Sequence, residues 1–420
     1  MVIKVYKNEK DISENDVKNV INEIFSNYRI SGCRVLIIIP DGTRTAPMPM
    51  FIRLFIEVLA NQVKKLGFLI ALGTHAPMSR EKIKQQYGIT DDSYFDCSNK
   101  VNIFNHQWNS PESIVELGRI KKEEVENISE GLLPLEMPVT INKNILDYDL
   151  IVICGPVFPH EIVGFSGGDK YFFPGISGPD VIDFTHWLAA LLTSMEVIGN
   201  PHTPVRALIE KAASLIPVPR IYFNMVMSDE GLGGLFVGDN KESWLSAVNL
   251  SKQLNVIYKD HSYSKVLSVI PTLYDDLWTA AKGMYKVEPV ISDGGEVIIY
   301  APHITEVSYT HGKLLDQIGY HVRDYYTKQW EAYKDFPWSV LGHSTHLRGS
   351  GKFNLMTRKE NPRIKVTLAT GISEGRCKRI NLNYLDPNSI LPESWIDREG
   401  EGILYVPRAG EKLFQMSASK

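Results

Sequence analysis

Residues that can transfer protons or form covalent bonds are concentrated in one short stretch of the chain. Lys170 lies between His160 and His186, and the same stretch contains four glycines, Gly164, Gly167, Gly168 and Gly175. It begins soon after the apolar residues 150–154, which are typical of a buried strand. Ligands of α/β proteins bind beyond the carboxyl ends of parallel strands, and glycines let the backbone approach a bound group closely. The pattern therefore predicts an active site around Lys170.

Lys170 allows three interpretations: a surface cation, a phosphate ligand or a nucleophilic amine. The glycines on both sides of it disfavour a surface cation. The Gly-Lys-Ser/Thr sequence of a phosphate-binding loop is absent, and no strand is followed here by the Gly-x-Gly-x-x-Gly pattern of dinucleotide-binding proteins. A covalent link through the amine remains open.

Two earlier strand-like segments also end in polar residues. Residues 34–40 lead into Asp41-Gly-Thr43-Arg44, and residues 68–72 lead into Gly73-Thr-His75. Arg44 can hold a carboxylate through two parallel hydrogen bonds, or it can pair with Asp41. His75 is a candidate for proton transfer, although a single histidine in such a loop is more often structural.

His186 lies in a predicted helix. A neutral imidazole is the commonest metal ligand among side chains, but no second ligand stands beside His186 at a metal-binding spacing. A metal here would take most of its coordination from elsewhere, such as a cofactor. The alternative is a buried structural histidine.

The second half of the chain adds weaker candidates. Lys282 lies late in a predicted helix, where a positive charge is favourable in any case. Residues 343–351, which include His343 and His346, are expected to form a polar, flexible loop. Such a loop either hydrogen-bonds a hydroxylated substrate or is a solvated turn.

The order of strand and helix signals predicts the fold. Strands at residues 34–40, 68–72, 102–104 and 150–154 alternate with helices, of which the first is expected to end near Gly67. This rhythm predicts an α/β fold with a parallel sheet and helices on both of its faces. The pattern restarts near residue 265, so we expect a larger N-terminal cofactor-binding and catalytic domain at 1–262 and a smaller C-terminal α/β domain at 263–420. The active site is expected in the cleft between them.

Composition excludes several classes of protein. The chain has 420 residues, of which 44% are hydrophobic and 22% charged, which is typical of a globular protein. Its net charge of -4 gives no general attraction to nucleic acid or to an anionic membrane. No apolar stretch is long enough to span a bilayer, and the N-terminus lacks the pattern of a signal peptide. With four scattered cysteines, the sequence predicts a cytoplasmic protein with reduced thiols.

Taken together, the segments resemble the nickel-dependent lactate racemase family, whose members racemise or epimerise 2-hydroxy acids. The similarity covers most of the chain. It rests on Asp41-x-Thr43-Arg44, Gly73-Thr-His75-x-Pro, His160…Gly-Phe-Ser-Gly167-Gly168-x-Lys170…Pro-Gly175…His186 and, more weakly, Lys282-Gly-Met284.

The resemblance implies a nickel-pincer nucleotide, a cofactor derived from nicotinic acid mononucleotide that holds the metal through sulfur, carbon and sulfur. By position, His186 is the protein ligand of nickel, and Lys170 is the lysine that can join the cofactor through a thioamide. His75 and His160 correspond to the two acid–base residues. The cofactor-binding set is completed by Asp41, Thr43, Gly167 and Gly168, and the substrate-binding set consists of Arg44, Lys282, Thr279 and His346. The implied reaction is inversion at C2 through proton-coupled hydride transfer, which leaves a neutral ketone beside the carboxylate.

Two departures from the family pattern bear on the substrate. Thr279 stands where lactate racemases have a glutamine, and Asp169 stands where they have a basic residue. With the polar groups of residues 343–346, these changes predict a 2-hydroxy acid larger or more hydroxylated than lactate, with an aldonic sugar acid as the candidate. The expected partners are this substrate and cofactor-biosynthesis proteins, with no nucleic acid or membrane, and an oligomer is compatible with the sequence.

Two other functions compete with this interpretation. A zinc-dependent hydrolase could use His75, His160 and His186, but it lacks a carboxylate at metal-ligand spacing and leaves Lys170 without a role. A non-catalytic protein that binds a carboxylate or a nucleotide is the third possibility.

Overall fold

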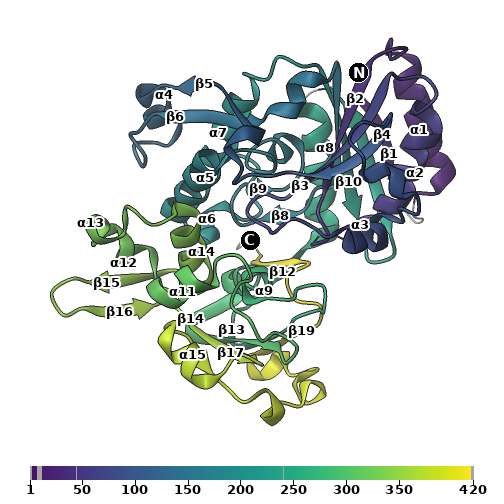
Figure 1. The fold of residues 1–420 in the computed structure, drawn as a ribbon. Helices are drawn as coiled ribbons and strands as arrows, with labels where there is room; N and C mark the ends of the chain where they lie inside the picture. The colour runs from purple at the N-terminus through teal and green to yellow at the C-terminus, as the bar shows by residue number, and fades with distance from the viewer. Residues whose placement is uncertain (1, 7–11, 44, 240, 418–420) are drawn as a thin grey trace. The chain divides into compact units, whose positions relative to one another are not determined.

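A seven-stranded sheet is the framework of the first part of the chain (Figure 1). The computed structural model describes residues 2–6, 12–43, 45–239 and 241–417. In spatial order the strands are β1 (Val2–Tyr6), β11 (Leu232–Gly238), β10 (Arg220–Met227), β7 (Leu150–Pro156), β2 (Arg34–Pro40), β3 (Lys65–Ala71) and β4 (Val101–Asn105). The five strands from β10 to β4 are parallel, whereas β11 and β1 pair antiparallel at one edge. The predicted parallel sheet is therefore confirmed, with an antiparallel edge added.

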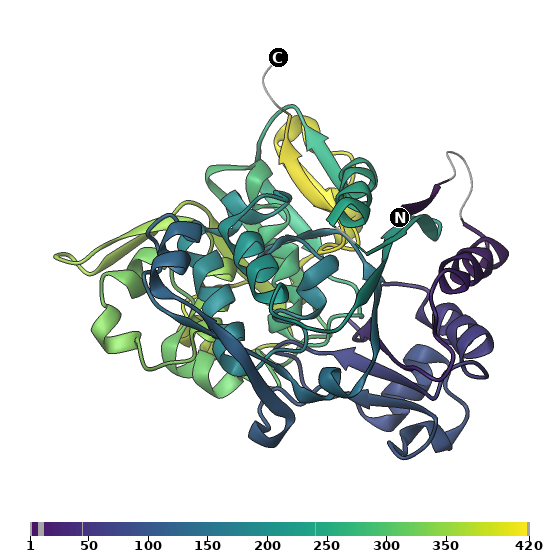
Figure 2. The same ribbon diagram turned by 90° about the horizontal axis from the view of Figure 1, so that it is seen from above.

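Helices cover both faces of this sheet. On one face, α1 (Glu14–Ser26), α2 (Met48–Leu59) and α3 (Arg80–Tyr87) share a core with alternate residues of the strands, such as Ile37 and Phe223. Figure 2 shows α1 and α2 next to each other. On the opposite face, α8 (Lys241–Asn255) packs against Val226 and Phe236, whose side chains point away from the first core. This alternation follows from the two-residue period of a strand, and it confirms the prediction of helices on both sides.

A second group of elements surrounds a smaller parallel sheet. Its strand order is β18 (Asn383–Tyr384), β17 (Lys365–Thr370), β14 (Ile291–Ala301), β13 (Tyr263–Val269) and β19 (Ile403–Val406). Its helices are α6 (Ser194–Val197), α9 (Leu277–Ala280), α10 (Lys282–Tyr285), α11 (Gly312–Ile318), α12 (Arg323–Thr327), α13 (Trp330–Tyr333), α14 (Trp338–Arg348) and α15 (Glu374–Arg379). Two short ribbons complete it: β12 (Val256–Lys259) beside β20 (Leu413–Met416), seen in Figure 2, and β15 (Gly351–Asn354) with β16 (Lys359–Pro362).

The remaining elements lie outside these two sheets. Strands β5 (Ile114–Ile120) and β6 (Met137–Asn142) pair antiparallel, and α4 (Lys122–Ile128) lies between them in the sequence. The two-residue strands β8 (Pro159–His160) and β9 (Gly164–Phe165) pair with each other. Two further helices are α5 (Pro179–Leu192) and α7 (Pro204–Ala213).

The chain divides into two compact units that are not continuous in sequence. The first unit takes the described residues of 1–158, 165–182 and 206–254, and the second takes 159–164, 183–205 and those of 255–420. The predicted boundary at residue 262 is thus close to the last crossing between units. The segments 159–164 and 183–205, which carry His160 and His186, pack with the second unit. The two predicted domains and the cleft between them stay predictions.

Three features of the sequence were interpreted wrongly. Gly67 does not end a helix, because α2 ends at Leu59 and Gly67 lies within β3. The predicted helix at 277–284 is divided into α9 and α10 at Ala281. Residues 343–348 belong to the buried helix α14 rather than to a flexible loop. Residues 339–347 of α14 are all buried, so the helix has no single apolar stripe that periodicity could detect.

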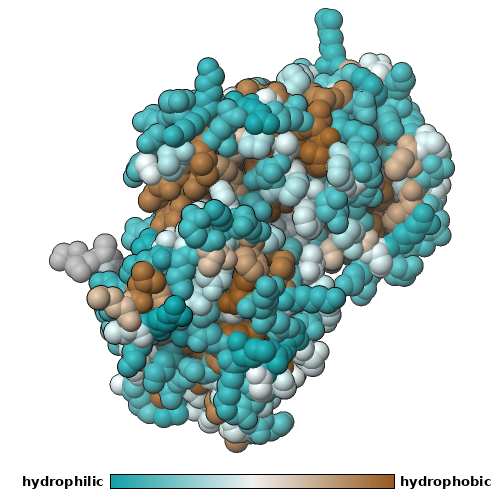
Figure 3. Space-filling view, turned by 60° about the vertical axis from the view of Figure 1, so that its left-hand side comes forward, coloured by the Kyte–Doolittle hydropathy of each residue, from teal (hydrophilic) through white to brown (hydrophobic). Residues whose placement is uncertain are grey.

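The surface and the cysteines add two observations. Figure 3 shows a face on which hydrophilic residues predominate and apolar residues form separate areas. Among the described residues, none of the helices has the length and apolar character needed to cross a membrane. All four cysteines are free thiols, as predicted.

The interior position of Gly67 yields a stability prediction. A Cβ atom at this position would collide with the hydroxyl of Tyr148 and lie 2.9 Å from its Cζ atom. Tyr148 is itself buried. We expect Gly67→Ala to lower the urea midpoint of unfolding, with a cost of about 1–3 kcal/mol, because overpacking forces neighbouring side chains out of place.

The control for this prediction is the same change in a Tyr148→Phe background. Removal of the hydroxyl eliminates the closest contact, so the added cost of Gly67→Ala should be smaller there. An equal cost in both backgrounds would show that Tyr148 is not what Gly67 accommodates.

Candidate active site

Asp41 and His75 meet at the carboxyl edge of the first sheet. They follow β2 and β3, which are neighbouring parallel strands with Pro40 opposite Ala71. A carboxylate oxygen of Asp41 is in a very short hydrogen bond with Nδ1 of His75. The other carboxylate oxygen accepts hydrogen bonds from the Thr43 hydroxyl at 2.7 Å and from the Thr43 amide at 3.2 Å. Asp41 is buried and His75 half-buried, so the imidazole is held while one side stays accessible. Arg44 lies outside the described residues.

Lys170 lies in the short 3-10 helix η4 (Gly168–Tyr171), whose cap residue Gly167 and first residue Gly168 both have left-handed backbone angles. Gly167 has φ +78° and Gly168 has φ +57°, and a Cβ atom on Gly167 would collide with Val157. Any other residue would be strained here, which explains the glycine pair. The loop approaches the first sheet closely enough that no side chain fits.

Side chains of β10 hold this loop in place. The Gly168 amide donates to Oδ1 of Asn224 at 3.3 Å, and the Tyr222 hydroxyl donates to Oδ1 of Asp169 at 2.5 Å. Tyr222 and Asn224 are two residues apart, so both face the same side of the sheet. Sequence reasoning missed both residues, because a polar side chain within an apolar strand gives no sign of what it binds.

A buried arginine also holds the loop of Lys170 through hydrogen bonds to its backbone. Arg206 of α7 is 2% exposed and donates hydrogen bonds to the carbonyl oxygens of Phe165 and Gly167, the latter at 3.4 Å. Its guanidinium carbon lies 4.2 Å from the centre of the Trp244 ring. Burial lowers the pKa of Arg206 to about 10, so it stays charged at neutral pH.

One backbone hydrogen bond links the segment before His75 to the segment after Lys170. The Gly73 amide donates to the Gly175 carbonyl at 3.0 Å. The structure thus brings the predicted residues Asp41, Thr43 and His75 into direct contact and ties their loop to the loop of Gly167, Gly168 and Lys170.

In the second unit, His186 lies where α5 and α14 pack closely. A Cβ atom on Gly342 of α14 would lie 3.0 Å from the carbonyl oxygen of His186, so only glycine fits without displacement. The next turn of α14 carries His343 and His346, which are 8% and 3% exposed. His343 stacks on Trp278, with ring centres 3.8 Å apart.

The second unit gathers basic groups around His343. Burial lowers the pKa of this imidazole well below its ordinary value, and positive charge on its neighbours lowers it further. These neighbours are His346, His311, His186 and Lys282. Burial also lowers the pKa of His346 to about 4. Both imidazoles are therefore neutral near pH 7, and within the described residues neither Nε2 atom has a hydrogen-bond partner.

Lys282 of α10 is one of the basic groups around His343, and Thr279 of α9 lies three residues before it. The ammonium group of Lys282 lies 4.6 Å from the centre of the Tyr274 ring. Asp276 caps α9 and accepts hydrogen bonds from the Thr279 amide at 2.9 Å and from the Thr279 hydroxyl at 2.8 Å. The Asp-x-x-Thr spacing of a helix cap is the signal that could have identified Asp276 in the sequence.

His160 is held differently from His75. It is 6% exposed, and its Nδ1 atom accepts a hydrogen bond from the Ile162 amide at 3.2 Å. A carboxylate oxygen of Glu161 lies 3.4 Å from the same Nδ1. The Nδ1 side of the ring is therefore held by its own loop.

The structure also tests the residues for metal binding. Across the described ranges there is no group of three His, Cys, Asp or Glu side chains that could hold a metal ion. The zinc-hydrolase interpretation of His75, His160 and His186 therefore gains no support. His106 has a packing role, since it is fully buried between the Ser177 carbonyl and the Asn142 amide.

The chain was compared with known proteins. Residues 2–197 match the family model of the lactate racemase N-terminal domain. Lactate racemase of Thermoanaerobacterium thermosaccharolyticum is 25% identical over 315 residues, which cover 71% of this chain and 67% of that protein. Lactate racemase of Lactiplantibacillus plantarum is 24% identical over 304 residues, covering 70% and 67%.

Residues 2–197 thus belong to the lactate racemase N-terminal domain family, and the similarity to lactate racemases extends over about 70% of the chain. The chain is accordingly an isomerase of the racemase type, as the sequence predicted.

Solved structures agree with the fold of this family. The crystal structure of a Thermotoga maritima protein is 31% identical to this chain and superposes with a TM-score of 0.88, covering 98% of this chain and 100% of the other. The lactate racemase apoprotein of Thermoanaerobacterium thermosaccharolyticum gives a TM-score of 0.72 at 18% identity, covering 96% and 93%. This second similarity confirms the α/β fold.

The buried imidazoles of this chain predict how its stability depends on pH. The folded-state pKa of His346, about 4, lies below its ordinary value of 6.5, so the unfolded chain binds more protons between these pH values. The contribution of His346 is fully present above pH 6.5 and is lost as the pH falls toward 4. Each unit of pKa difference corresponds to about 1.4 kcal/mol. We expect the urea midpoint of His346→Gln to fall less between pH 6.5 and 4 than that of the wild type.

The comparison at pH 8 is the control, because the imidazole is neutral there in both states and only packing differs. Parallel curves for the two proteins from pH 8 to pH 4 would contradict a neutral, buried His346.

Proposed function

We propose that this protein inverts C2 of a 2-hydroxy acid by proton-coupled hydride transfer, with a nickel-pincer nucleotide as cofactor. The observation that carries the proposal is the Asp41–His75 pair, because it supplies an oriented base in the motif that the family shares. A carboxylate that fixes one imidazole nitrogen leaves the other nitrogen to exchange a proton with a ligand.

The residues fit the implied cofactor. The cofactor itself supplies three donors to the metal, so the protein has to supply only one ligand. His186 stands at the family's position for that ligand. The described side chains form no group of three metal ligands, and such a site does not need one. The glycine pair before Lys170 permits the positive backbone angles that pack this loop against Val157 and Trp244 and so fix the position of Lys170. Lys170 and His186 would hold the cofactor, together with Asp41, Thr43, Gly167 and Gly168. When bound, the cofactor supplies a hydride acceptor for C2 of the substrate.

The two histidines have complementary protonation. Because a carboxylate can only accept, Nδ1 of His75 carries the proton shared with Asp41, and its Nε2 is free to act as a base. Nδ1 of His160 accepts the Ile162 amide, so in the neutral ring Nε2 carries the proton. His75 is thus ready to take the hydroxyl proton of one enantiomer, and His160 is ready to protonate the carbonyl oxygen that becomes the hydroxyl of the other. The reverse direction exchanges these roles.

The basic groups of the second unit suit a carboxylate substrate. Lys282 is 6% exposed, so a substrate carboxylate near it would interact in a poorly hydrated environment where the attraction is strong. Arg44 is proposed to share this role on the basis of the family motif.

Polar groups in the second unit favour a substrate larger than lactate. His346 lines a cavity of about 100 Å³ together with Thr193, Ser194 and Arg323. Its Nε2 atom and these hydroxyl groups can serve the additional hydroxyls of a sugar acid. Thr279 is shorter than the glutamine of lactate racemases and is turned toward Asp276, which leaves more space near Lys282. We therefore propose an aldonic acid as the substrate class.

The test uses the full chain, produced with the cofactor-biosynthesis proteins and analysed for nickel. Single enantiomers of 2-hydroxy acids and aldonic acids are offered in deuterated water. We expect inversion with no solvent deuterium at C2, since hydride returns to the carbon that lost it. Deuterium at C2 would show ordinary proton abstraction, and bound zinc with hydrolytic activity would favour the alternative enzyme class.

Variants identify the acid–base residues. His75→Asn and His160→Asn should each lower kcat by about 10²–10⁴-fold while nickel content stays unchanged, because an acid–base group contributes on that order. His186→Ala should instead lose nickel. The matched control is His202→Asn at an exposed position. If the His75 and His160 variants retain the full rate, the assignment of both histidines is wrong.

A further inference from the structure

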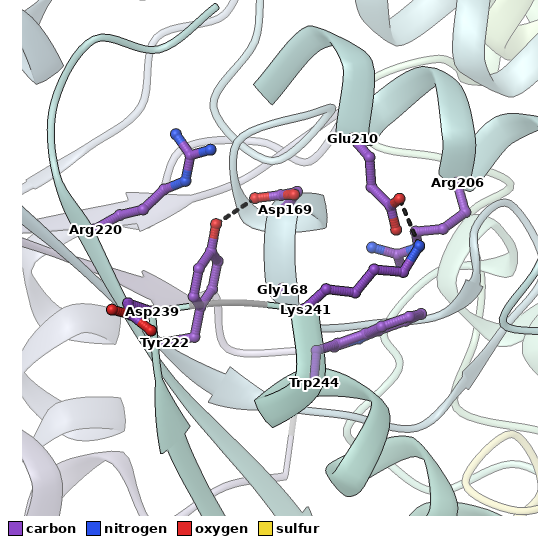
Figure 4. A pocket seen from close by; sticks show the side chains of 9 residues that line it. All are labelled: Gly168, Asp169, Arg206, Glu210, Arg220, Tyr222, Asp239, Lys241 and Trp244. Carbon is purple, nitrogen blue, oxygen red and sulfur yellow. Dashed lines mark hydrogen bonds and ion pairs between the residues drawn. The ribbon is translucent and has the colours of Figure 1, made fainter. Parts of the chain in front are cut away.

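A second cavity lies in the first unit, beside the loop that carries Lys170 (Figure 4). It has a volume of about 210 Å³. Gly168 and Asp169 form one wall, and the other walls come from the start of β10, from α7 and from the start of α8. The charged residues that line it are Asp169, Arg206, Glu210, Arg220, Asp239 and Lys241.

The cavity is separate from the edge of the sheet where Asp41 and His75 lie. Arg220 and Tyr222 stand at the amino end of β10, opposite Ile151 and Ile153 at the amino end of β7. The proposed acid–base residues of this unit follow the carboxyl ends of parallel strands. Of the residues proposed to hold the cofactor, Gly168 alone lines this cavity, so the cavity adjoins the cofactor loop but contains neither His75 nor Asp41.

The lining combines both signs of charge in a particular way. Lys241 forms an ion pair with Glu210 at 2.7 Å, and Asp169 accepts the hydrogen bond of Tyr222, as the dashed lines in Figure 4 show. Burial raises the pKa of Asp169. Arg220 forms no ion pair with any of the described residues, and its guanidinium carbon lies 5.8 Å from the Phe172 ring. Arg220 is near enough to Asp169 for its charge to lower the pKa of that carboxyl, but it makes no direct ion pair within the described part of the chain. The cavity thus offers a guanidinium that can still take a direct carboxylate partner, beside carboxylates that can accept hydrogen bonds.

This combination discriminates between ligands. A bare inorganic anion would meet Glu210 and Asp239 as well as Arg220, so repulsion would offset much of the attraction. A neutral polyol could donate hydroxyls to the carboxylates but would leave the guanidinium unused. A molecule with one carboxylate and several hydroxyl groups satisfies both kinds of wall group.

We propose that this cavity is a binding site for a small hydroxylated carboxylate, which places its carboxylate on Arg220 and its hydroxyls toward Glu210 and Asp239. Trp244 supplies an apolar wall for the carbon chain. The site adjoins Asp169, the residue that replaces the basic residue of the family pattern, so it is built partly from what distinguishes this chain. The proposal concerns binding, and it stands whether or not the chain is a racemase.

The test measures binding of D-gluconate to the full-length, nickel-free protein by isothermal titration calorimetry. Arg220→Met should weaken gluconate binding by about tenfold or more, because a charged hydrogen bond is lost. Arg29→Met, which removes an exposed arginine of the same unit, is the matched control and should bind as the wild type does. Lys282→Ala, which removes a proposed substrate-binding cation in the other unit, should retain this binding event.

Further ligands and one further variant complete the test. Glucitol, which lacks the carboxylate, and inorganic phosphate should both bind at least tenfold more weakly than gluconate. Asp239→Asn, at an exposed position on the rim, should weaken gluconate binding several-fold and serves if Arg220→Met does not fold. The proposal is overturned if the wild type does not bind gluconate, if the Arg220 or Asp239 variant binds normally, if Lys282→Ala abolishes binding, or if glucitol or phosphate binds as tightly.

Discussion

The parallel register of β2 and β3 is the constraint on which the proposed acid–base chemistry depends. Pro40 and Ala71 are paired at the end of these strands, so the residues that follow them leave the sheet side by side. Asp41 can reach His75 only because strands β2 and β3 run in the same direction. An antiparallel pair would place the two residues at opposite ends of the sheet. Catalytic geometry at this edge is thus a result of strand topology, which apolar packing on both faces stabilises.

Two kinds of environment surround the candidate residues, and they suit different tasks. In the first unit, the backbone is shaped by glycines and fixed by Asn224, Tyr222 and Arg206, which holds the loop of Lys170 in one conformation. In the second unit, imidazoles and a lysine are buried together, and this raises the cost of positive charge. An anionic ligand would relieve that cost. The first environment therefore fits recognition by shape, and the second fits recognition by charge.

The sequence predicted much of this arrangement, and the failures have physical causes. Strands β2, β3 and β7 each contain a continuous apolar run, a pattern that buried parallel strands share with few other elements. The motif residues near Lys170 were identified because their chemical types are unusual together. Gly67 was misjudged because a glycine can end a helix or make room for a neighbouring ring, and only the position of Tyr148 distinguishes the two. Helix α14 was missed because burial all round removes the periodic signal.

Contacts between distant segments were beyond prediction for the same reason. Asn224 and Tyr222 act on residues more than fifty positions away, and no local pattern encodes such a pairing. Asp276, in contrast, accepts hydrogen bonds from Thr279, only three residues later, and this spacing is a recognisable helix-capping pattern. The sequence therefore predicts local chemistry and the order of strands along the chain. It does not predict which distant side chains hydrogen-bond to a loop.

Arg206 imposes a limit on how this chain can diverge. Its planar guanidinium reaches two carbonyl oxygens at once while its central carbon lies 4.2 Å from the centre of the Trp244 ring, a combination that an ammonium group does not reproduce. Replacement by lysine would keep the charge yet leave one carbonyl without a donor. The exchange of Arg206 for lysine, although conservative in charge, is therefore disfavoured at this position. A tolerated change of residue 206 is expected to be accompanied by a change of Trp244.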